Sequence, residues 1–432
     1  MILFINFQKI FRKMEVMPLS SSVSGTVNAP PSKSAMQRAI ACALLARGRS
    51  EIHNPSLCDD ALAALKMAEC MGAATARQDK MIIVDGGYKP HCSELFCGES
   101  GLGARLFAPL ASLNAGWMEI RGSGSLLERP MNMLSDTLGQ MGVEVISKGG
   151  FLPLKIRGPI KGGLAFVDGS LSSQLLTGLL IALPVVKEDS RLIVRDLKSK
   201  PYIDLTIDIL NHFGVELINE NYSLFSIPGD QEYKPSSYTV EGDWGGAAFL
   251  LVLAALAGDI RVKGLSAGST QPDRKVLDVL RDAGADVEVS AGEVRVKKAV
   301  LKPFTADLSD CPDLAPPLAV LASFCHGNSI ISGTERLKVK ESDRGSALMK
   351  EMSALGVRIM NYENRIEIEG PSRLKEGRVD SHGDHRISMA LTILSVASGV
   401  KVRISGAESV NKSYPGFYDD LGKLGVSINL SE

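Results

Sequence analysis

The sequence predicts an α/β protein with two lobes, built from six copies of one small unit of strands and helices. Three observations lead to this fold class. The 432-residue chain is too long for a single ordinary core, which favours two or more domains. Hydrophobic residues make up 45% of it and charged residues 22%, as is typical of a globular protein. Finally, a pattern that ends in glycine recurs along the chain at nearly constant spacing.

Each copy of the pattern is a helical run that ends in Gly, followed by Val or Ala and a strand-like run. The gaps between the six glycines are 70, 72, 70, 72 and 69 residues. Glycine closes a helix because it adopts the left-handed conformation without a steric penalty, and alternation after it is typical of a strand. Six such units predict two domains of three units each. The glycines are Gly72, Gly142, Gly214, Gly284, Gly356 and Gly425.

The stretch 236–256 lies near the middle of the chain and is expected to separate the lobes. It holds Gly242, Gly245 and Gly246 between a strand and a strongly apolar helix. Glycines at this junction favour a hinge, and a two-lobed protein with a hinge often closes on its ligand. Residues 1–13 are apolar with a basic end and lack a small-residue cleavage site, so they predict an N-terminal extension rather than a secretory signal.

Charge and cysteine content exclude several classes of partner. The net charge is −1, from 48 basic and 49 acidic residues, so no global basic field exists to hold nucleic acid. No apolar stretch is long enough to cross a membrane. Seven cysteines without a Cys-x-x-Cys pair predict reduced thiols in a cytoplasmic protein. The sequence also lacks a P-loop pattern, which disfavours ATP-dependent chemistry of that type.

Charged and hydroxyl residues gather at the starts of predicted helices in the first half of the chain. Lys33 and Arg38 lie in one such segment, and Ser172 and Ser173 open another. Free N–H groups at a helix start can bind an anion, although Ser at this place also serves as a plain helix cap. These residues therefore predict either an anion site or ordinary caps beside solvated cations.

The second half adds more charge at helix starts. In the run 336–344, RLKVKESDR, six of nine side chains are charged. Asp313 and the triplet Asp384–Arg386 precede apolar helices, and Lys412 precedes a proline turn. If these helix starts face one cleft, that cleft is rich in cations although the net charge is near zero. Such a cleft suits a small substrate with several phosphates and carboxylates. His382 and His385 lack a nearby third ligand, so no metal site is expected.

Six short motifs, in this order along the chain, resemble those of the 5-enolpyruvylshikimate-3-phosphate synthase family of enolpyruvyl transferases. They are PPSKSAMQR, SLSSQ, KPYID, DCPD, RLKVKESDR and GDHRISMAL. The resemblance runs from about residue 20 to 430, and VKESDR together with GDHR is specific within the enolpyruvyl transferases. It implies two lobes of three βαβαββ-type units. It also implies transfer of the enolpyruvyl group of phosphoenolpyruvate to the 5-hydroxyl of shikimate 3-phosphate, with release of phosphate.

The resemblance places this reaction in the shikimate pathway to chorismate and aromatic amino acids. The enzyme it implies is a cytoplasmic monomer that takes two small-molecule substrates and needs no metal or redox cofactor. Lobe one would be 30–243 and would mainly bind shikimate 3-phosphate. Lobe two would combine 14–29 with 244–432 and supply donor binding and catalytic acids. Hinges would lie near 26–30 and 240–246.

The resemblance also assigns roles to individual residues. Asp313 would be the base at the 5-hydroxyl, Glu341 would move the methylene proton with Lys33, and His385 would support it. Asp343 is expected to hold Arg344, and Lys338 to be solvated. Shikimate 3-phosphate would contact Lys33, Ser34, Arg38, Ser172, Ser173, Gln174, Ser199, Tyr202, Asp313 and Lys340. Phosphoenolpyruvate would contact Lys33, Gly101, Gln174, Arg344, Arg386 and Lys412.

Three places depart from the family pattern. Residues 99–102 read Glu-Ser-Gly-Leu where relatives usually have Asn-Ala-Gly-Thr. Ser125 stands where relatives usually have an Arg on the donor side, and Arg336 stands where many have an amide. We hypothesise that Arg121 or Arg129 supplies the missing cation.

Three alternatives remain open at the level of sequence. An inactive or slow relative would bind shikimate 3-phosphate without turning it over. A UDP-N-acetylglucosamine enolpyruvyl transferase usually has Lys-Asn after its first strand and a loop Cys, whereas this chain has Lys33-Ser34 and no Cys between Cys97 and Cys311. An RNA-processing cyclase with a related fold is disfavoured by the near-neutral charge.

Overall fold

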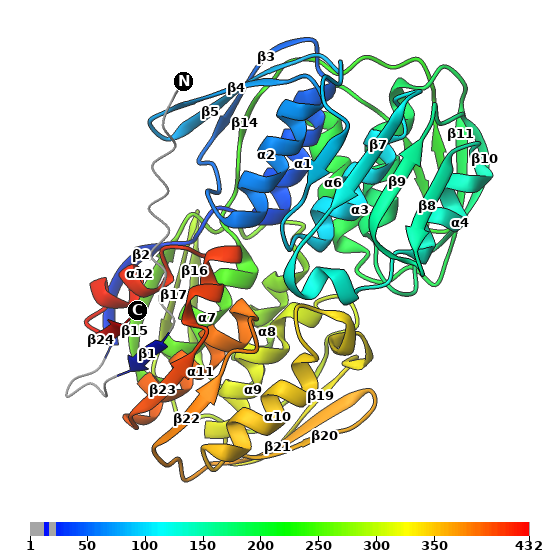
Figure 1. Cartoon of the computed structure of the whole chain (residues 1–432). Coiled ribbons are helices and arrows are strands. Elements are labelled where there is room, and N and C mark those ends of the chain that lie inside the picture. The colour runs from blue at the N-terminus through cyan, green and yellow to red at the C-terminus, as the bar shows by residue number, and fades with distance from the viewer. Residues whose placement is uncertain (1–12, 17–22, 432) are drawn as a thin grey trace. The chain divides into compact units, whose positions relative to one another are not determined.

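The structure is a computed structural model that describes residues 13–16 and 23–431 (Figure 1). The chain divides into two compact units, which we call unit 1 and unit 2. Unit 2 comprises 31–241 with 270–272, and unit 1 comprises the rest of the described chain. Residues 1–12 of the predicted extension lie outside the described residues, whereas Lys13 begins strand β1 (Lys13–Val16). None of the helices described combines the length and hydropathy that a membrane crossing requires.

Within the described residues, unit 2 contains three four-stranded sheets of one topology. In each sheet the first two strands are parallel and the remaining pairings are antiparallel. In spatial order the strands are β14 (Ser237–Thr239), β3 (Gly48–His53), β5 (Met81–Gly86) and β4 (Ala74–Gln78); β6 (Glu94–Phe96), β7 (Trp117–Arg121), β9 (Phe151–Arg157) and β8 (Glu144–Lys148); and β10 (Gly163–Asp168), β11 (Ser190–Arg195), β13 (Leu224–Ile227) and β12 (Ile218–Glu220). The helices are α1 (Lys33–Leu45), α2 (Asp59–Cys70), α3 (Gly101–Ala111), α4 (Asn132–Gln140), α5 (Gln174–Ala182) and α6 (Pro201–His212).

The described part of unit 1 has three sheets of the same topology. In spatial order its strands are β2 (Val23–Asn28), β15 (Gly258–Lys263), β17 (Glu293–Lys297) and β16 (Asp286–Ser290); β18 (Thr305–Asp307), β19 (Gly327–Ser332), β21 (Arg365–Gly370) and β20 (Arg358–Asn361); and β22 (Gly377–Asp380), β23 (Val402–Ser405), β1 and β24 (Ile428–Ser431). The helices are α7 (Trp244–Ala257), α8 (Val276–Asp282), α9 (Ala315–Phe324), α10 (Arg344–Ala354), α11 (His385–Ser398) and α12 (Phe417–Lys423).

The six-fold repeat predicted from glycine spacing is confirmed. All six glycines have positive φ, between 78° and 118°. Each follows the second helix of its repeat and precedes the next strand, as Gly142 does between α4 and β8. Along the chain, β6, α3, β7, α4, β8 and β9 show the βαβαββ order that the resemblance implies. Three sheets take a strand from far along the sequence: β14 pairs with β3, β2 with β15, and β1 with both β23 and β24.

A second series of glycines lies in or just after the last strand of four repeats, against the backbone at or beyond the end of the first helix of the same repeat. A Cβ on Gly158 would lie 1.8 Å from the carbonyl oxygen of Ser112, which follows α3. The equivalent positions Gly86, Gly229 and Gly370 would also bring a Cβ within 3 Å of backbone carbonyls. These glycines are needed because two backbone segments approach closely there.

We therefore expect Gly158→Ala to lower the free energy of unfolding by about 1–3 kcal/mol, the usual cost of overpacking. Gly139, on α4, is the matched control because nothing lies within 4 Å of its Cβ position. Gly139→Ala should leave stability unchanged or slightly raised, since Ala is the better helix former. Urea denaturation of both variants measures the difference, and equal midpoints would contradict the close approach.

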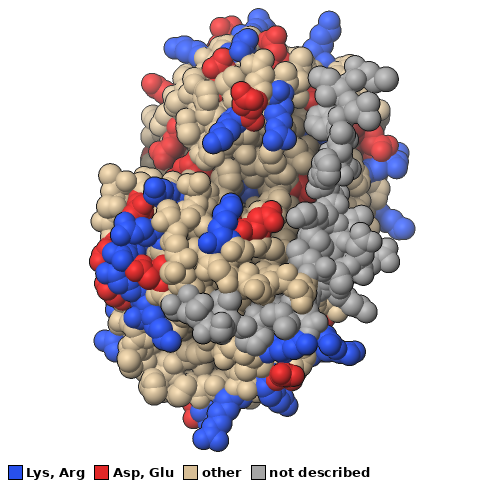
Figure 2. Space-filling model, turned by 90° about the vertical axis from the view of Figure 1, so that its left-hand side faces the viewer, with Lys and Arg blue, Asp and Glu red and all other residues tan. Residues whose placement is uncertain are grey.

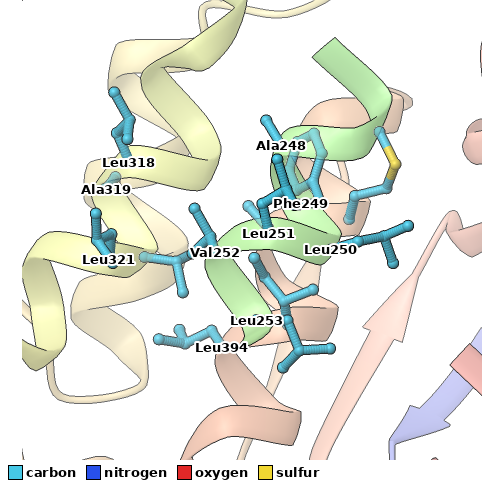
Figure 3. Packing of buried hydrophobic residues seen from close by; sticks show 14 of the residues in the cluster. Ala248, Phe249, Leu250, Leu251, Val252, Leu253, Leu318, Ala319, Leu321 and Leu394 are labelled. Atoms are coloured by element: carbon cyan, nitrogen blue, oxygen red, sulfur yellow. The ribbon is translucent and has the colours of Figure 1, made fainter. Parts of the chain in front are cut away.

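Each unit has its own hydrophobic core. In unit 1, α7 is buried along nearly its whole length because it is apolar on every face. Figure 3 shows residues 248–253 of α7 packed beside Leu318 and Leu321 of α9 and Leu394 of α11. Most charged residues lie on the surface, and Figure 2 shows both signs interspersed on one face, in keeping with the near-zero net charge.

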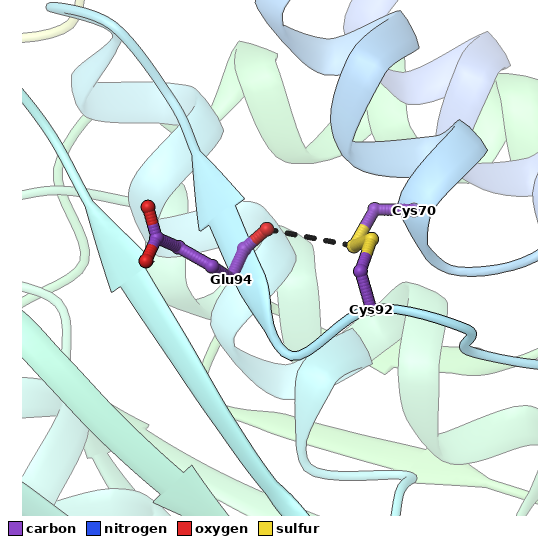
Figure 4. The surroundings of a disulfide bond; sticks show 3 residues. All are labelled: Cys70, Cys92 and Glu94. Carbon is purple, nitrogen blue, oxygen red and sulfur yellow. Dashed lines mark hydrogen bonds between the residues drawn. A yellow bond between two sulfur atoms is a disulfide. The ribbon is translucent and has the colours of Figure 1, made fainter.

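The structure corrects the prediction that all seven cysteines are reduced. A disulfide joins Cys70, at the end of α2, to Cys92, in the segment before β6 (Figure 4). The fold brings their Cα atoms to 5.4 Å, within the range that a disulfide requires. No spacing motif announces this pair, because the contact depends on how α2 and β6 pack. Burial raises the pKa of the Cys58 and Cys325 thiols to about 11, so both stay protonated.

Loss of this disulfide should lower stability by about 3 kcal/mol, because the two cysteines are 22 residues apart and the cross-link restricts the unfolded chain. We expect Cys92→Ser to lower the free energy of unfolding by that amount and to shift the urea midpoint downward accordingly. A reductant should shift the wild-type midpoint by as much and leave the variant unaffected. A wild-type midpoint that does not respond to reductant would contradict the cross-link.

Candidate active site

In unit 2, Arg38 is a deeply buried member of the predicted binding residues. It projects from α1 and is 2% exposed. Its Nε donates to Thr206 Oγ1 at 2.8 Å and its Nη2 to Thr177 Oγ1 at 3.2 Å. Burial lowers the pKa of Arg38 to about 10, so the side chain is charged at neutral pH. The site therefore keeps a desolvated guanidinium, which is a strong attractant for a phosphate or carboxylate.

The Arg38 side chain also donates to backbone carbonyls of residues that were predicted from separate motifs. Its Nη1 donates to the Ser34 carbonyl at 2.9 Å and its Nη2 to the Tyr202 carbonyl at 3.3 Å. The helix that carries it starts at Lys33 because Ser32 Oγ caps it by accepting from Ala35 N. Motifs near residues 33 and 202 thus converge on one guanidinium.

Sequence reasoning missed the two threonines that orient Arg38. Thr177 and Thr206 are fully buried on α5 and α6, and their hydroxyls lie 3.2 Å apart. Thr206 Oγ1 also donates to the carbonyl of Tyr202, one helical turn earlier. In sequence each threonine lies among apolar residues and looks like part of a core helix. The only available signal was a hydroxyl on an otherwise apolar face.

Lys33 also has a partner that the sequence did not predict. Its Nζ lies 2.8 Å from Asp60 Oδ2, and the two side chains are 16% and 9% exposed. Asp60 is at the start of α2, where a negative charge interacts favourably with the helix dipole. An anionic substrate would compete with Asp60 for the ammonium group.

The remaining hydroxyls of unit 2 lie at the starts of α5 and α6. Ser172 Oγ accepts from Gln174 N at 3.2 Å, and Ser173 is buried as the residue before α5. Ser199 is buried just before α6, with φ at +57°. Positive φ in a residue other than glycine is uncommon and stores strain of the kind found at ligand sites.

Gly101, the first residue of α3, lies against two buried arginines. A Cβ added to it would be 2.9 Å from Arg129 Nη1 and 3.1 Å from Arg105 Nη1. Both arginines are 6% exposed. Arg105 Nη1 donates to Gln174 Oε1 at 2.8 Å, which links Gly101 to another predicted residue. A side chain at position 101 would therefore have to displace the guanidinium groups.

Of the two cations hypothesised to replace the missing one at position 125, only Arg129 lies beside Gly101. The Arg121 side chain is 50% exposed and pairs with Glu119 at 2.8 Å and Glu94 at 3.3 Å. The Arg121 side chain therefore belongs to ion pairs on the surface of its sheet. Arg129 directly follows the 3-10 helix η1 (Gly124–Glu128).

In unit 1, Arg344 is the centre of a cluster of carboxylates. It is 1% exposed, and Nε lies 2.8 Å from Asp384 Oδ2. Nη1 lies 2.7 Å from Asp313 Oδ1 and Nη2 2.5 Å from Glu341 Oε2. Burial lowers the pKa of Arg344, but Asp384, Glu341 and Asp313 outweigh it and raise the pKa.

The expectation that Asp343 holds Arg344 was wrong. Asp343 caps α10 instead, because its carboxylate accepts from Ser346 N at 3.1 Å and Ser346 Oγ at 2.7 Å. The partner is Asp384, the fully buried N-cap of α11. Sequence adjacency was misleading because a helix cap turns back on its own helix.

Asp313 lies between three cations. It accepts from Arg344, lies 2.9 Å from Arg386 Nη2, and lies 3.2 Å from Lys340 Nζ. Burial raises the pKa of Asp313, but Arg386, Lys340 and Arg344 together hold it well below 3.8. Burial also lowers the pKa of Lys340, against the attraction of Asp313. The cluster thus holds strong charges of both signs. Its carboxylates contact the same cations that would attract an anionic ligand.

Three further predicted residues lie near the start of α11. His385 is 1% exposed, and its Nδ1 lies 3.7 Å from Asp384 Oδ1. Arg386 Nη1 donates to the carbonyls of Gly245 and Asp313, both at 3.2 Å. Lys412 Nζ donates to the Gly383 carbonyl at 2.7 Å, one residue before the N-cap.

The two remaining basic residues of RLKVKESDR differ in environment. Arg336 is buried and donates to the Ser309 carbonyl, so it is part of the packed loop structure. Lys338 is exposed, as expected of a solvated side chain. No group of three or more potential metal ligands occurs among residues 13–16 and 23–431.

The predicted residues thus form two sets, one in each unit. Unit 2 holds Lys33, Ser34, Arg38, Gly101, Ser172, Ser173, Gln174, Ser199 and Tyr202. Unit 1 holds Asp313, Lys340, Glu341, Arg344, His385, Arg386 and Lys412. The first set offers cations and hydroxyls, and the second offers cations together with carboxylates that can exchange protons.

Comparison with known proteins identifies the family of this chain. The family model "EPSP synthase (3-phosphoshikimate 1-carboxyvinyltransferase)" matches residues 18–421. A 3-phosphoshikimate 1-carboxyvinyltransferase from Clostridium kluyveri is 37% identical over 412 residues, 95% of this chain and 97% of that one. One from Methanocorpusculum labreanum is 38% identical over 422 residues, 96% and 99% of the two chains.

Solved structures show the same fold. An EPSP synthase from Acinetobacter baumannii aligns with a TM-score of 0.83 and 25% identity, over 97% of this chain and all of that chain. The enolpyruvyl transferase NikO from Streptomyces tendae aligns with a TM-score of 0.80 and 17% identity, over 98% and 99% of the chains, which is a likeness of fold. Because the family model and relatives above 30% identity span nearly the whole chain, this protein belongs to the EPSP synthase (3-phosphoshikimate 1-carboxyvinyltransferase) family.

Proposed function

We propose that this protein transfers the enolpyruvyl group of phosphoenolpyruvate to the 5-hydroxyl of shikimate 3-phosphate and releases phosphate. The observation that carries the proposal is the family match over residues 18–421, which includes nearly all the charged and hydroxyl residues described above. In the reaction, the 5-oxygen bonds to C2 of the enol and its proton leaves. The methylene carbon gains a proton; then the C2–O bond to phosphate breaks as a methyl proton is lost.

We assign shikimate 3-phosphate mainly to unit 2. The buried Arg38, with Lys33 and the hydroxyls that open α5 and α6, supplies the cations and donors that a phosphate ester needs. Asp313 and Lys340 of unit 1 would contact the ring hydroxyls of shikimate 3-phosphate. The phosphoenolpyruvate ligands would be Arg344, Arg386 and Lys412.

The charge cluster suggests how Asp313 becomes a base. Three cations hold the pKa of Asp313 well below its ordinary value, so the carboxylate takes protons poorly in the structure described. An anionic donor that binds Arg344 and Arg386 draws positive charge away from Asp313. Its pKa then rises, and the group can accept the hydroxyl proton. Glu341 would be released from Arg344 by the same exchange and move the methylene proton, with Lys33 and with His385 in support.

We propose a cytoplasmic monomer that needs no metal or redox cofactor. Proton transfer and neutralisation of phosphate charge are tasks that these carboxylates and cations can perform themselves. Each unit buries a core of its own within one chain, which is consistent with a monomer. The family match favours this function over the three alternatives considered from the sequence.

Phosphate release tests the proposal. Purified protein should release phosphate only when shikimate 3-phosphate and phosphoenolpyruvate are both present. Glu341→Gln should slow release by about 10²–10⁴-fold, the usual contribution of a proton-transfer group. Glu335→Gln is the matched control, because Glu335 is exposed on the neighbouring 3-10 helix and should leave the rate unchanged. Tight binding of shikimate 3-phosphate without any release would instead show an inactive relative.

A further inference from the structure

Two residues that depart from the family pattern, Glu99 and Ser125, contact each other. Ser125 donates to Glu99 Oε2 twice, from its backbone N at 3.2 Å and from Oγ at 3.3 Å. The neighbouring Gly124 has φ at +56°, and a Cβ on it would lie 2.3 Å from Glu99 Cδ. The carboxylate therefore occupies space that a side chain at position 124 would fill. The two departures together form one specific contact.

This contact fixes the start of η1, the segment that leads to Arg129. The chain enters η1 at Gly124, and the Arg129 backbone N donates to the Leu126 carbonyl at 3.2 Å as η1 ends. Because η1 has five residues, a shift of its first residues would also move the arginine that follows it.

Arg129 and Arg105 bring two buried positive charges to the same place. Their Nη1 atoms lie 2.9 and 3.1 Å from the Cβ position of Gly101. Arg105 is held there by Gln174 Oε1 at 2.8 Å and the Pro130 carbonyl at 3.1 Å. In a buried site a guanidinium attracts an anion strongly, because little water screens the two charges. The start of α3 adds backbone N–H groups, whose partial positive charge also attracts an anion.

We propose that Arg105 and Arg129 bind the anionic donor in this protein, and that Glu99 is a positioning residue that sets Arg129 through Ser125. Arg129 then takes over the role of the arginine that is absent at position 125. The assignment rests on the proposed function, because it takes phosphoenolpyruvate as the donor. Glu99 adds negative charge on the donor side, but its bonds to Ser125 direct the carboxylate toward η1.

Steady-state kinetics with each substrate varied in turn test both parts. Arg129→Ala and Arg105→Ala should each raise KM for phosphoenolpyruvate by roughly 30-fold or more, the effect of truncating a buried charged contact. KM for shikimate 3-phosphate should change less than about twofold. Arg121→Ala is the matched control, since that side chain is 50% exposed and should leave both KM values unchanged.

The positioning role makes a separate prediction. Glu99→Ala should raise KM for phosphoenolpyruvate by about tenfold, and adding Ser125→Ala should raise it little further, because the two residues act as one unit. Glu99→Gln should restore most of the loss, since its amide oxygen still accepts from Ser125. If Glu99 only repelled the donor, Glu99→Ala and Glu99→Gln would both lower this KM, and the positioning role would be overturned.

The outcomes separate this inference from the proposed function. Wild-type turnover with an unchanged phosphoenolpyruvate KM in Arg129→Ala would overturn the inference alone. Absence of phosphate release from the wild-type protein would overturn the proposed function and the donor assignment together. Calorimetric binding of shikimate 3-phosphate and thermal unfolding of every variant show whether a loss arises from misfolding; normal values in both are expected.

Discussion

Replacing Arg344 with methionine should lower the free energy of unfolding by about 3–5 kcal/mol, because three carboxylates of a buried ion cluster would lose the guanidinium that contacts each of them. Asp384 is fully buried, and Asp313 and Glu341 contact the same guanidinium. Repulsion among the three carboxylates would then be less well compensated, although Asp313 keeps Arg386 and Lys340. Turnover should fall on the order of 10³-fold, as expected when a donor of charge stabilisation is removed. Urea denaturation and phosphate release measure the two effects.

The same variant should alter the acid sensitivity of the protein. Because the folded state holds the pKa of Asp313 below 3.8, this group stabilises the fold above that value and loses its contribution as the pH falls through the lower folded pKa. Without Arg344 the pKa is depressed less, so stability should fall less steeply below pH 3.8. Arg358→Met is the matched control, since Arg358 is 58% exposed and pairs only on the surface of its sheet. Equal stability of the two variants would contradict the cluster.

Replacing Arg38 with methionine should weaken binding of shikimate 3-phosphate by about 2–5 kcal/mol, or some 30- to 5000-fold. The change removes a buried guanidinium and leaves the hydroxyls of Thr177 and Thr206 without their shared donor. Arg38→Lys should also bind poorly, because an ammonium cannot reproduce the planar set of bonds. Calorimetric titration measures the affinity directly.

Arg49→Met provides the control for this series, because Arg49 lies in the same unit and its side chain is 58% exposed. It should bind shikimate 3-phosphate as the wild type does. An Arg38→Met variant that folds and keeps wild-type affinity would show that Arg38 does not bind the phosphate.

The repeat could be predicted from the sequence because each copy ends in a glycine with an obligatory backbone conformation. Gly72 and its five counterparts all have positive φ. The second glycine series escaped notice because its members, such as Gly158, are required by contact with a distant backbone rather than by their own dihedral angles. The pairing of Cys70 with Cys92 was missed for the same reason: it depends on packing between elements.

The candidate site was predictable as a set of residue types and only partly as a set of contacts. Cations and acids at helix starts are visible in the sequence, so Arg38, Arg344 and Asp313 could be named. Their partners lie on other elements, often more than 30 residues away, as Asp384 does from Arg344. Short-range reasoning instead assigned Asp343, whose side chain is committed to capping α10. Thr206 was hidden because a buried threonine on an apolar helix resembles a core residue.

The most direct test of the central claim is mass spectrometry of the reaction mixture with shikimate 3-phosphate and phosphoenolpyruvate. The account predicts one product whose mass equals the sum of the two substrates less one phosphoric acid, formed together with an equal amount of phosphate. Phosphate released from phosphoenolpyruvate alone, or no product of that mass, would contradict the assignment of this protein as an enolpyruvyl transferase.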